Sequence, residues 1–343
     1  MPQRVKLAGV IRRHPSIPVA SLTVARDDQL ESIYRESHAL WGSGLSAEDY
    51  LGLWRELTDT EWARRHAGMY VWHDDAGQVL SSVKLYRPEL RVGDRVCRAT
   101  IISALFTPSA HRGCGHASRL VEAVLAHAHE RGDPLALLFS DIDPEFYRRL
   151  GFRALPAQEQ WGTLPTDPCP PAGWSLRPRV GPDLAAISCA HLESGRSRPL
   201  AMIRDAHHWS FLDVRSSRFF ERLDDPRLTY RQQIALRGEE FAGYLITVEG
   251  RGEWNVREVG AVEGSPGTMA TILRLGAQQT QAARLRGFYG WLPPGVAEQL
   301  PDWRIHNRRR HRAVPMVRGL DEGLDLSGLT TPDAAYLAFQ DQY

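Results

Sequence analysis

The chain has 343 residues, of which 43% are hydrophobic and 24% charged, and its formal charge at pH 7 is +1. This length predicts about two globular domains, and the near-neutral charge excludes a strongly basic surface for nucleic acid or anionic membranes. No apolar run is long enough to cross a bilayer, and basic residues interrupt the N-terminus where a signal peptide has its apolar core. We therefore expect a cytoplasmic protein without a nucleic-acid or membrane partner.

The four cysteines are scattered along the chain. They lack the close spacing of zinc ligands, so we expect neither a disulfide framework nor a metal site. Cys114 lies in a glycine-bearing turn, where a small residue that fits the turn is a better interpretation than a redox thiol.

The first part of the chain predicts a strand, two helices and a hairpin. Asp27 is a candidate cap for the first helix, and Ser46 with Asp49 resembles a capping box that opens the second. The hairpin turns at 74–77, and its alternating pattern suits a sheet with one covered face. The predicted elements span 21–25, 28–40, 47–66, 69–72 and 79–86.

A strand, a glycine-bearing turn and a helix follow one another at 99–131. The strand ends in Leu105-Phe106-Thr107, and the turn carries Arg112-Gly113-Cys114-Gly115-His116-Ala117-Ser118. The first helical turn offers unpaired N–H groups and the positive end of the helix dipole, and glycines let phosphate oxygens approach the backbone. For the glycines alone, an ordinary tight turn is the alternative. We predict that this turn binds a pyrophosphate.

A second apolar strand, 135–140, leads through Asp141 and Asp143 into the sequence FYRRLGF at 146–152. The arginine and glycines of the turn, followed at this distance by FYxxLGF, resemble the GNAT superfamily of acetyl-CoA-dependent N-acetyltransferases. The resemblance implies an α/β (α+β) fold with a mixed, mostly antiparallel sheet flanked by helices. In that fold the two parallel strands, here 99–106 and 135–140, splay apart around the thioester. Acetyl-CoA is then the co-substrate, bound by 105–107 and 112–118.

The order of elements restarts after a proline-rich stretch. Strands are predicted at 175–178, 228–236, 241–248, 254–262 and 288–292, and helices at 183–192 and 268–286. This is again the GNAT order, so we predict an active domain at 1–160, a linker at 161–174 and a degenerate second copy at 175–343. The loop 263–268 lacks a basic residue and spaced glycines, so the second copy is not expected to bind CoA well.

Three further features end the chain. The basic run 306–312 is interpreted as a solvated loop, because few aromatic residues accompany it. A strand is predicted at 315–320. Thr331, Pro332 and Asp333 predict the start of a final helix, which docks as a tail ending at Tyr343.

Two subfamilies are similar in part. Residues 34–152 resemble the fungal acetyltransferases that act on the side-chain amine of free lysine, through WGSGLS at 41–46, EWA at 61–63 and FSDIDPEFY at 139–147. The two-copy layout resembles the enhanced-intracellular-survival acetyltransferases, which modify aminoglycoside amines. Their further sterol-carrier-like domain needs more chain than this one has.

The implied chemistry is direct attack of a primary amine on the thioester carbonyl. An amine with a reference pKa of about 10.4 must first lose a proton. A backbone N–H near Leu105 to Thr107 is the candidate oxyanion donor, and Tyr147 is the candidate general acid for the leaving thiolate, although a lone tyrosine is more often a core residue. For the base, three alternatives stay open: Asp141, which is equally a helix cap, the α-carboxylate of Tyr343, which the two-copy resemblance implies, and a water chain.

The acceptor site has weaker signals. Candidates for an aromatic wall, at a spacing that is more typical of core residues, are Trp41, Tyr50, Trp54 and Trp62. Acidic residues such as Glu36 and Asp49 either bind a cationic acceptor or belong to a solvated face. We expect a small cationic amine, such as free lysine or a polyamine. The alternatives are an aminoglycoside or protein N-terminal acetyltransferase, or an acetyl-CoA sensor without turnover, and a homo-oligomer stays open.

Overall fold

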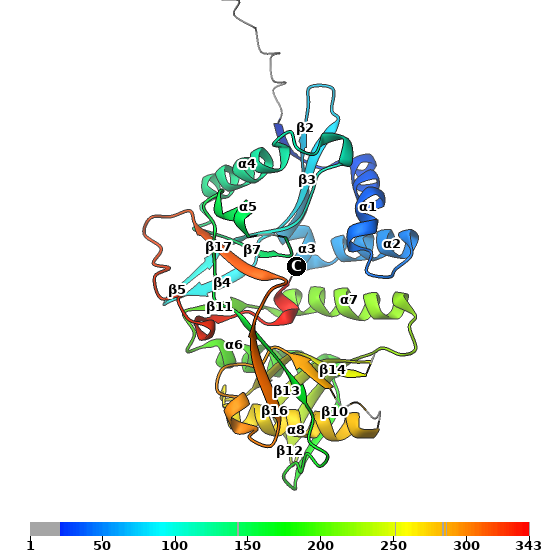
Figure 1. Cartoon of the computed structure of the whole chain (residues 1–343), viewed down its shortest axis with the longest axis vertical. Coiled ribbons are helices and arrows are strands. Elements are labelled where there is room, and N and C mark those ends of the chain that lie inside the picture. The colour runs from blue at the N-terminus through cyan, green and yellow to red at the C-terminus, as the bar shows by residue number, and fades with distance from the viewer. Residues whose placement is uncertain (1–20, 143, 251, 283–284, 286, 343) are drawn as a thin grey trace, which may run out of the picture.

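Figure 1 shows the computed structural model of the chain, which describes residues 21–142, 144–250, 252–282, 285 and 287–342. The helices are α1 (Asp27–Trp41), α2 (Ala47–Thr58), α3 (Glu61–His66), α4 (His116–Glu130), α5 (Glu145–Arg148), α6 (Leu184–Gly195), α7 (Ala206–Leu223) and α8 (Pro266–Ala282). The strands are β1 (Ser21–Val24), β2 (Ala67–His73), β3 (Val79–Tyr86), β4 (Glu89–Val92), β5 (Arg95–Arg98), β6 (Thr100–Phe106), β7 (Leu135–Ser140), β8 (Arg153–Ala154), β9 (Gln158–Thr163), β10 (Trp174–Pro178), β11 (Leu200–Ile203), β12 (Thr229–Arg237), β13 (Glu240–Gly250), β14 (Glu253–Ala261), β15 (Gly287–Gly290), β16 (Arg304–Arg309), β17 (Val314–Gly319) and β18 (Ala335–Tyr336).

The first sheet has the order β1-β2-β3-β6-β7-β17-β8 and is mostly antiparallel. β6 and β7 are parallel neighbours, as expected for strands joined through a helix. Their pairing runs from Thr100 opposite Ala136 to Ile102 opposite Leu138 and stops there, although β6 continues to Phe106. The two strands therefore open into the predicted V.

Helices cover both faces of this sheet. The apolar stripe of α4, with Leu120 and Val124 fully buried, packs on the face that carries Val83 and Leu138. Helices α1, α2 and α3 pack on the opposite face, where Ile101 lies in the same core as Leu57.

The second sheet has the order β10-β12-β13-β14-β15-β9-β16 and lies below the first in Figure 1. Its strand β9 comes from the first half of the chain, whereas β17 from the second half completes the first sheet. The two units exchange a strand in each direction. The predicted boundaries at 160 and 175 therefore do not coincide with the division between the sheets, and strand β9 (Gln158–Thr163) runs across the boundary predicted at 160.

The two units share a broad apolar contact. Helix α7 lies between them in Figure 1, packing against α2 and α3 on one side and β12 on the other. A small sheet of order β18-β11-β4-β5 combines β4 and β5 from the first half with strands from the second. A single buried core spans both halves, with Leu53 and Tyr244 among its members.

Several local predictions need correction. The N-cap of α1 is Arg26, and Asp27 is the first helical residue. The predicted helix 47–66 is two helices, because Thr60 accepts the Ala63 N–H through its side chain and caps a new one. Ser46 caps α2 as predicted, accepting from the Asp49 N–H over 3.0 Å.

The end of the chain also differs from its prediction. The basic run is strand β16, whose backbone pairs with β9, so most of it is no loop. The final helix is replaced by short 3-10 turns at Pro332–Ala334 and Phe339–Asp341 around β18. Nearly every side chain at 334–341 is buried, which suits an extended docked tail better than a one-faced helix. Tyr343 and Asp143, both named above, lie outside the described residues.

Candidate functional site

The predicted phosphate turn lies between the end of β6 and the start of α4. Gly113 and Gly115 have φ angles of 77° and 78°, which glycine adopts without strain. A Cβ added at either position would meet no heavy atom within 4 Å, so the backbone is open to a ligand. α4 begins directly after Gly115, and its first N–H groups supply the positive end of the helix dipole.

This turn forms one wall of a groove of about 790 Å³. Arg112 lines the groove, and its Nε donates to the Thr107 carbonyl oxygen over 3.0 Å, which fixes the turn. Burial, followed by the charge of Arg119, lowers the pKa of His116. The predicted residues that line the groove are Thr107, Arg112, Gly113, Gly115, His116, Ala117 and Ser118, and the lining residues that sequence reasoning missed are His111, Glu122, Phe146, Arg149 and Leu150.

Three residues predicted to bind the cofactor do not line this groove. Cys114 is exposed, and its Sγ points back to the Arg112 carbonyl oxygen at 3.7 Å. Leu105 and Phe106 lie at the end of β6, inside the V. The pairing of β3 with β6 shifts register there, from Lys84 opposite Ser103 to Ser82 opposite Phe106, with Ala104 at a φ of 46°. This bulge re-aims the backbone at the position where an oxyanion donor is needed.

Tyr147 lies on α5, buried against Phe146 and Phe152, with ring centroids at 4.9 and 6.0 Å. Burial, with a smaller effect of Asp141, raises the pKa of Tyr147 to about 12. The phenol therefore stays protonated at neutral pH, as a general acid must be before it donates. Asp141 itself is exposed, and one of its carboxylate oxygens accepts the Ala313 N–H over 2.8 Å.

A second cavity, of about 370 Å³, lies between the halves on the α1–α2 face of the sheet. Trp41, Tyr50 and Trp54 line it as predicted, and Trp41 contacts Phe106 edge to face at 6.1 Å, which joins the cavity to the V. Its charged lining residues are Arg215 and Arg257, and burial, followed by the charge of Arg215, lowers the pKa of Arg257 to about 10.

The remaining acceptor candidates lie elsewhere. Trp62 is a core residue, stacked on His208 at 4.2 Å and tilted against Phe211 at 4.8 Å. Glu36 and Asp49 are on exposed or half-buried helix surface and do not line the cavity, and Asp49 accepts from the cap residue Ser46. Of the two alternatives given for these residues, the solvated helix face fits their positions.

The docked tail reaches the cavity through Gln342, which lines it. A buried ion network holds the tail: Arg204 donates to Asp341 over 2.7 Å and to Glu258 over 2.9 Å, and all three side chains are 0% exposed. Burial acts to raise the pKa of Glu258, but the charge of Arg204 and a hydrogen bond with His191 outweigh it and lower that pKa to about 2. Sequence reasoning missed this network because its members are far apart in the chain.

Residues 25–155 match the family model described as "Acetyltransferase (GNAT) domain". Residues 25–155 are a GNAT acetyltransferase domain. The turn at 112–118 and Tyr147, on which the predicted resemblance rests, both lie within this acyltransferase domain. No curated protein matches the sequence significantly.

Solved structures share the tandem GNAT fold over most of the chain. A probable N-acyltransferase from Enterococcus faecalis V583 has a TM-score of 0.68 at 15% identity and covers 88% of this chain and 73% of its own. Eis1 from Mycobacterium abscessus has a TM-score of 0.56 at 13% identity, covering 88% and 74%. A tandem GNAT protein from the clavulanic acid biosynthesis pathway has a TM-score of 0.52 at 15% identity, covering 89% and 99%. The resemblance to fungal lysine acetyltransferases stays a prediction.

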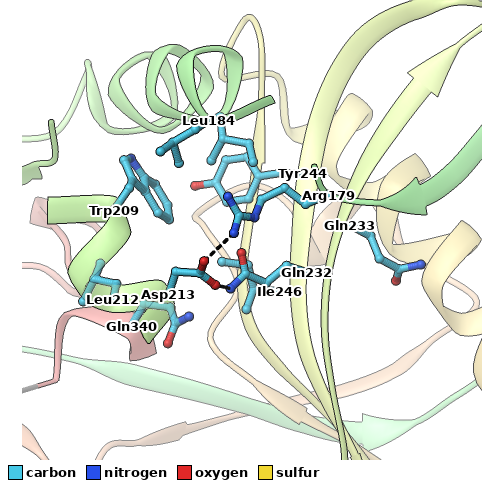
Figure 2. A pocket seen from close by; sticks show the side chains of 11 residues that line it. Arg179, Leu184, Trp209, Leu212, Asp213, Gln232, Gln233, Tyr244, Ile246 and Gln340 are labelled. Atoms are coloured by element: carbon cyan, nitrogen blue, oxygen red, sulfur yellow. Dashed lines mark hydrogen bonds and ion pairs between the residues drawn. The ribbon is translucent and has the colours of Figure 1, made fainter. Parts of the chain in front are cut away.

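A small cavity of the second unit lies between α6, α7, β12 and β13, away from its loop 263–268. This cavity, shown in Figure 2, has a volume of only about 10 Å³. Arg179, Asp213 and Gln232 point at one another across it and are joined by contacts of 2.5 Å. The cavity is nearly filled by its own side chains, and whether the loop 263–268 binds CoA stays a prediction.

Two searches were negative for the part of the chain that the structure describes. No helix there is long and apolar enough to cross a membrane. No group of three or more His, Cys, Asp or Glu side chains is arranged there to hold a metal ion.

Proposed function

We propose that this GNAT domain transfers the acetyl group of acetyl-CoA directly to the primary amine of a small acceptor in the aromatic cavity. The observation that carries the proposal is the place of Phe106 at the end of β6, between two hollows: it precedes the groove residue Thr107 and contacts the cavity residue Trp41 edge to face. The cofactor and the acceptor then approach the thioester carbon from opposite sides.

Each step has a candidate residue. The phosphate turn and Arg149 bind the pyrophosphate, and a backbone N–H at the bulge near Leu105 stabilises the oxyanion. Tyr147 gives its proton to the leaving thiolate. For the base, Asp141 and the α-carboxylate of Tyr343 are both retained, because Asp141 follows β7 at the V and Tyr343 follows the cavity residue Gln342.

The cavity bears on the acceptor class. The faces of Trp41, Tyr50 and Trp54 suit an ammonium group, whereas the buried charge of Arg257 disfavours an acceptor with several cationic groups. An acceptor like free lysine carries a carboxylate as well as its amines, so it fits this lining better than a polyamine, which carries only amines.

Release of free CoA thiol from acetyl-CoA tests the proposal, with lysine, polyamines, aminoglycosides and N-terminal peptides as acceptors. We expect acceptor-dependent release with a lysine-like amine, at a rate that Tyr147→Phe lowers about 100-fold or more, the usual scale of acid catalysis. Tyr70→Phe, a tyrosine that faces α4 near His127, is the matched control. Release that is unchanged in Tyr147→Phe would remove that residue from the mechanism.

A further inference from the structure

Lys84 is one of only two lysines in a chain with 42 lysine and arginine residues. It lies on β3, between Val83 and Leu85, and points to the α1–α2 face of the sheet. Its side chain is 5% exposed, and its Nζ has no hydrogen-bond partner among the described residues. The Nζ lies over the ring of Trp54, 2.7 Å from the centroid, and 4.8 Å from that of Tyr34.

The amine faces a cavity of about 170 Å³ that is separate from the groove and the aromatic cavity. Apolar side chains such as Leu30 and Met69 form most of its wall, and Lys84 is the charged residue that lines it. The exposed residues Val24 and Thr58 mark the side at which it meets solvent. The cavity is thus a mostly apolar chamber with one basic group.

An amine in this position is costly without a partner. Burial lowers the pKa of Lys84 well below its ordinary value. The other titratable groups that line the cavity, Tyr34 on α1 and Tyr86 on β3, have raised pKa values, chiefly through burial, so both are neutral. Arginine, which the chain uses at nearly every other basic position, remains charged and cannot take this neutral form.

We infer that this cavity is a binding site for a small, largely apolar monocarboxylate whose carboxylate pairs with the Nζ of Lys84. A carboxylate supplies the partner that the amine lacks, and the apolar walls cover the rest of the ligand. A dry cavity of about 150 Å³ holds a benzene ring, so an acid of about the size of benzoate fits.

Binding is coupled to protonation. The ligand enters as an anion and favours the ammonium form of Lys84, so amine that burial has left neutral takes up a proton from solvent when the pair forms. Because Trp54, Leu57 and Tyr86 line both this cavity and the aromatic cavity, the carboxylate is either a separate ligand or one end of the acceptor. The binding inference does not depend on the proposed acetyl transfer.

Calorimetric titration of the full chain with benzoate near pH 8, in phosphate and in Tris, tests it. We expect saturable binding with proton uptake, seen as a buffer-dependent enthalpy. Lys84→Met should lower the affinity for benzoate at least tenfold and abolish the proton uptake. Benzyl alcohol, which has no carboxylate, should bind both proteins with equal affinity. Leu30→Trp, which keeps the lysine and fills the cavity, should also lose benzoate.

Two further experiments distinguish a carboxylate that belongs to the acceptor from one that belongs to a separate ligand. If it belongs to the acceptor, 4-(aminomethyl)benzoate releases CoA thiol and benzoate competes with it; if it is a separate ligand, benzoate binds without competing with the acceptor. Both results support the site, even where acetyl transfer fails. Equal benzoate affinity in Lys84→Met, or no binding of benzoate or of linear monocarboxylates to the wild-type chain, would overturn it.

Discussion

At the scale of single residues, Tyr147 sets the alkaline limit of the reaction. Because burial raises its pKa to about 12, the phenol remains protonated throughout the neutral and mildly alkaline range. A general acid must carry its proton, so the rate should rise with pH as the acceptor amine is deprotonated, with no fall from Tyr147 below about pH 11. A pH profile of kcat/KM for thiol release checks this, and a fall beginning near pH 9 that Tyr147→Phe removes would contradict it.

Lys84 predicts a pH-dependent stability. Its pKa in the folded chain lies well below that in the unfolded chain, so between these two values the unfolded state binds an extra proton and stability rises with pH. We expect Lys84→Met to be more stable at pH 7 by about 1–3 kcal/mol, the cost of an unpaired buried polar group. The gain should shrink towards pH 10. Urea unfolding at both pH values measures it, and an equal gain at both would contradict the linkage.

At the scale of elements, the groove residue Arg149 has a natural control beside it. Arg149 lines the groove, whereas Arg148 does not line it and pairs instead with Glu145 at 3.4 Å. Reversing a charge beside bound phosphates should lower acetyl-CoA affinity roughly tenfold in Arg149→Glu, because charge-assisted contacts to phosphate are lost. Arg148→Glu should bind normally. Titration with acetyl-CoA compares them, and equal losses would point to a general field effect.

The sequence predicted correctly those elements whose signals lie within a short stretch of chain. The strand, turn and helix around Gly113 and the helix that carries Tyr147 depend on periodicity, glycines and a parallel crossover, all within a short stretch. Strand β16 was missed because a run of arginines is more typical of a solvated loop. Its partner strand β9 lies more than 140 residues earlier in the chain, so no local pattern indicates the pairing. Its Arg308 pairs with the buried Glu159, a partner that periodicity does not reveal.

At the scale of the molecule, the site also depends on contacts between distant segments, which local sequence patterns do not reveal. The exchange of β9 and β17, and the cavity between α2 and α7, depend on pairings between distant segments. The aromatic lining residues were predicted one by one from the sequence. The lining residue Arg257 and the tail-binding residue Arg204 were not predicted, because no local pattern marks them. Because strands cross in both directions, separating the chain near residue 160 would leave each sheet incomplete.

The tail brings the second unit to the aromatic cavity, which is the proposed acceptor site. Asp341 accepts from Arg204 within a fully buried network, and the next residue, Gln342, lines the aromatic cavity. Asp341→Asn removes one of the two carboxylates that pair with Arg204, and breaking a buried pair costs about 3–5 kcal/mol. We expect the tail to become sensitive to proteolysis and the acceptor KM to rise.

Acetyl-CoA affinity should not change in this variant, because the phosphate turn lies in the first unit, on the other face of its sheet. Asp325→Asn, which alters an exposed aspartate that accepts from the Ser327 N–H at 2.7 Å, is the matched control. If Asp341→Asn raised the KM for acetyl-CoA as much as that for the acceptor, the network would support the whole fold rather than the cavity. A selective rise for the acceptor means that the degenerate unit is retained because its tail completes the pocket.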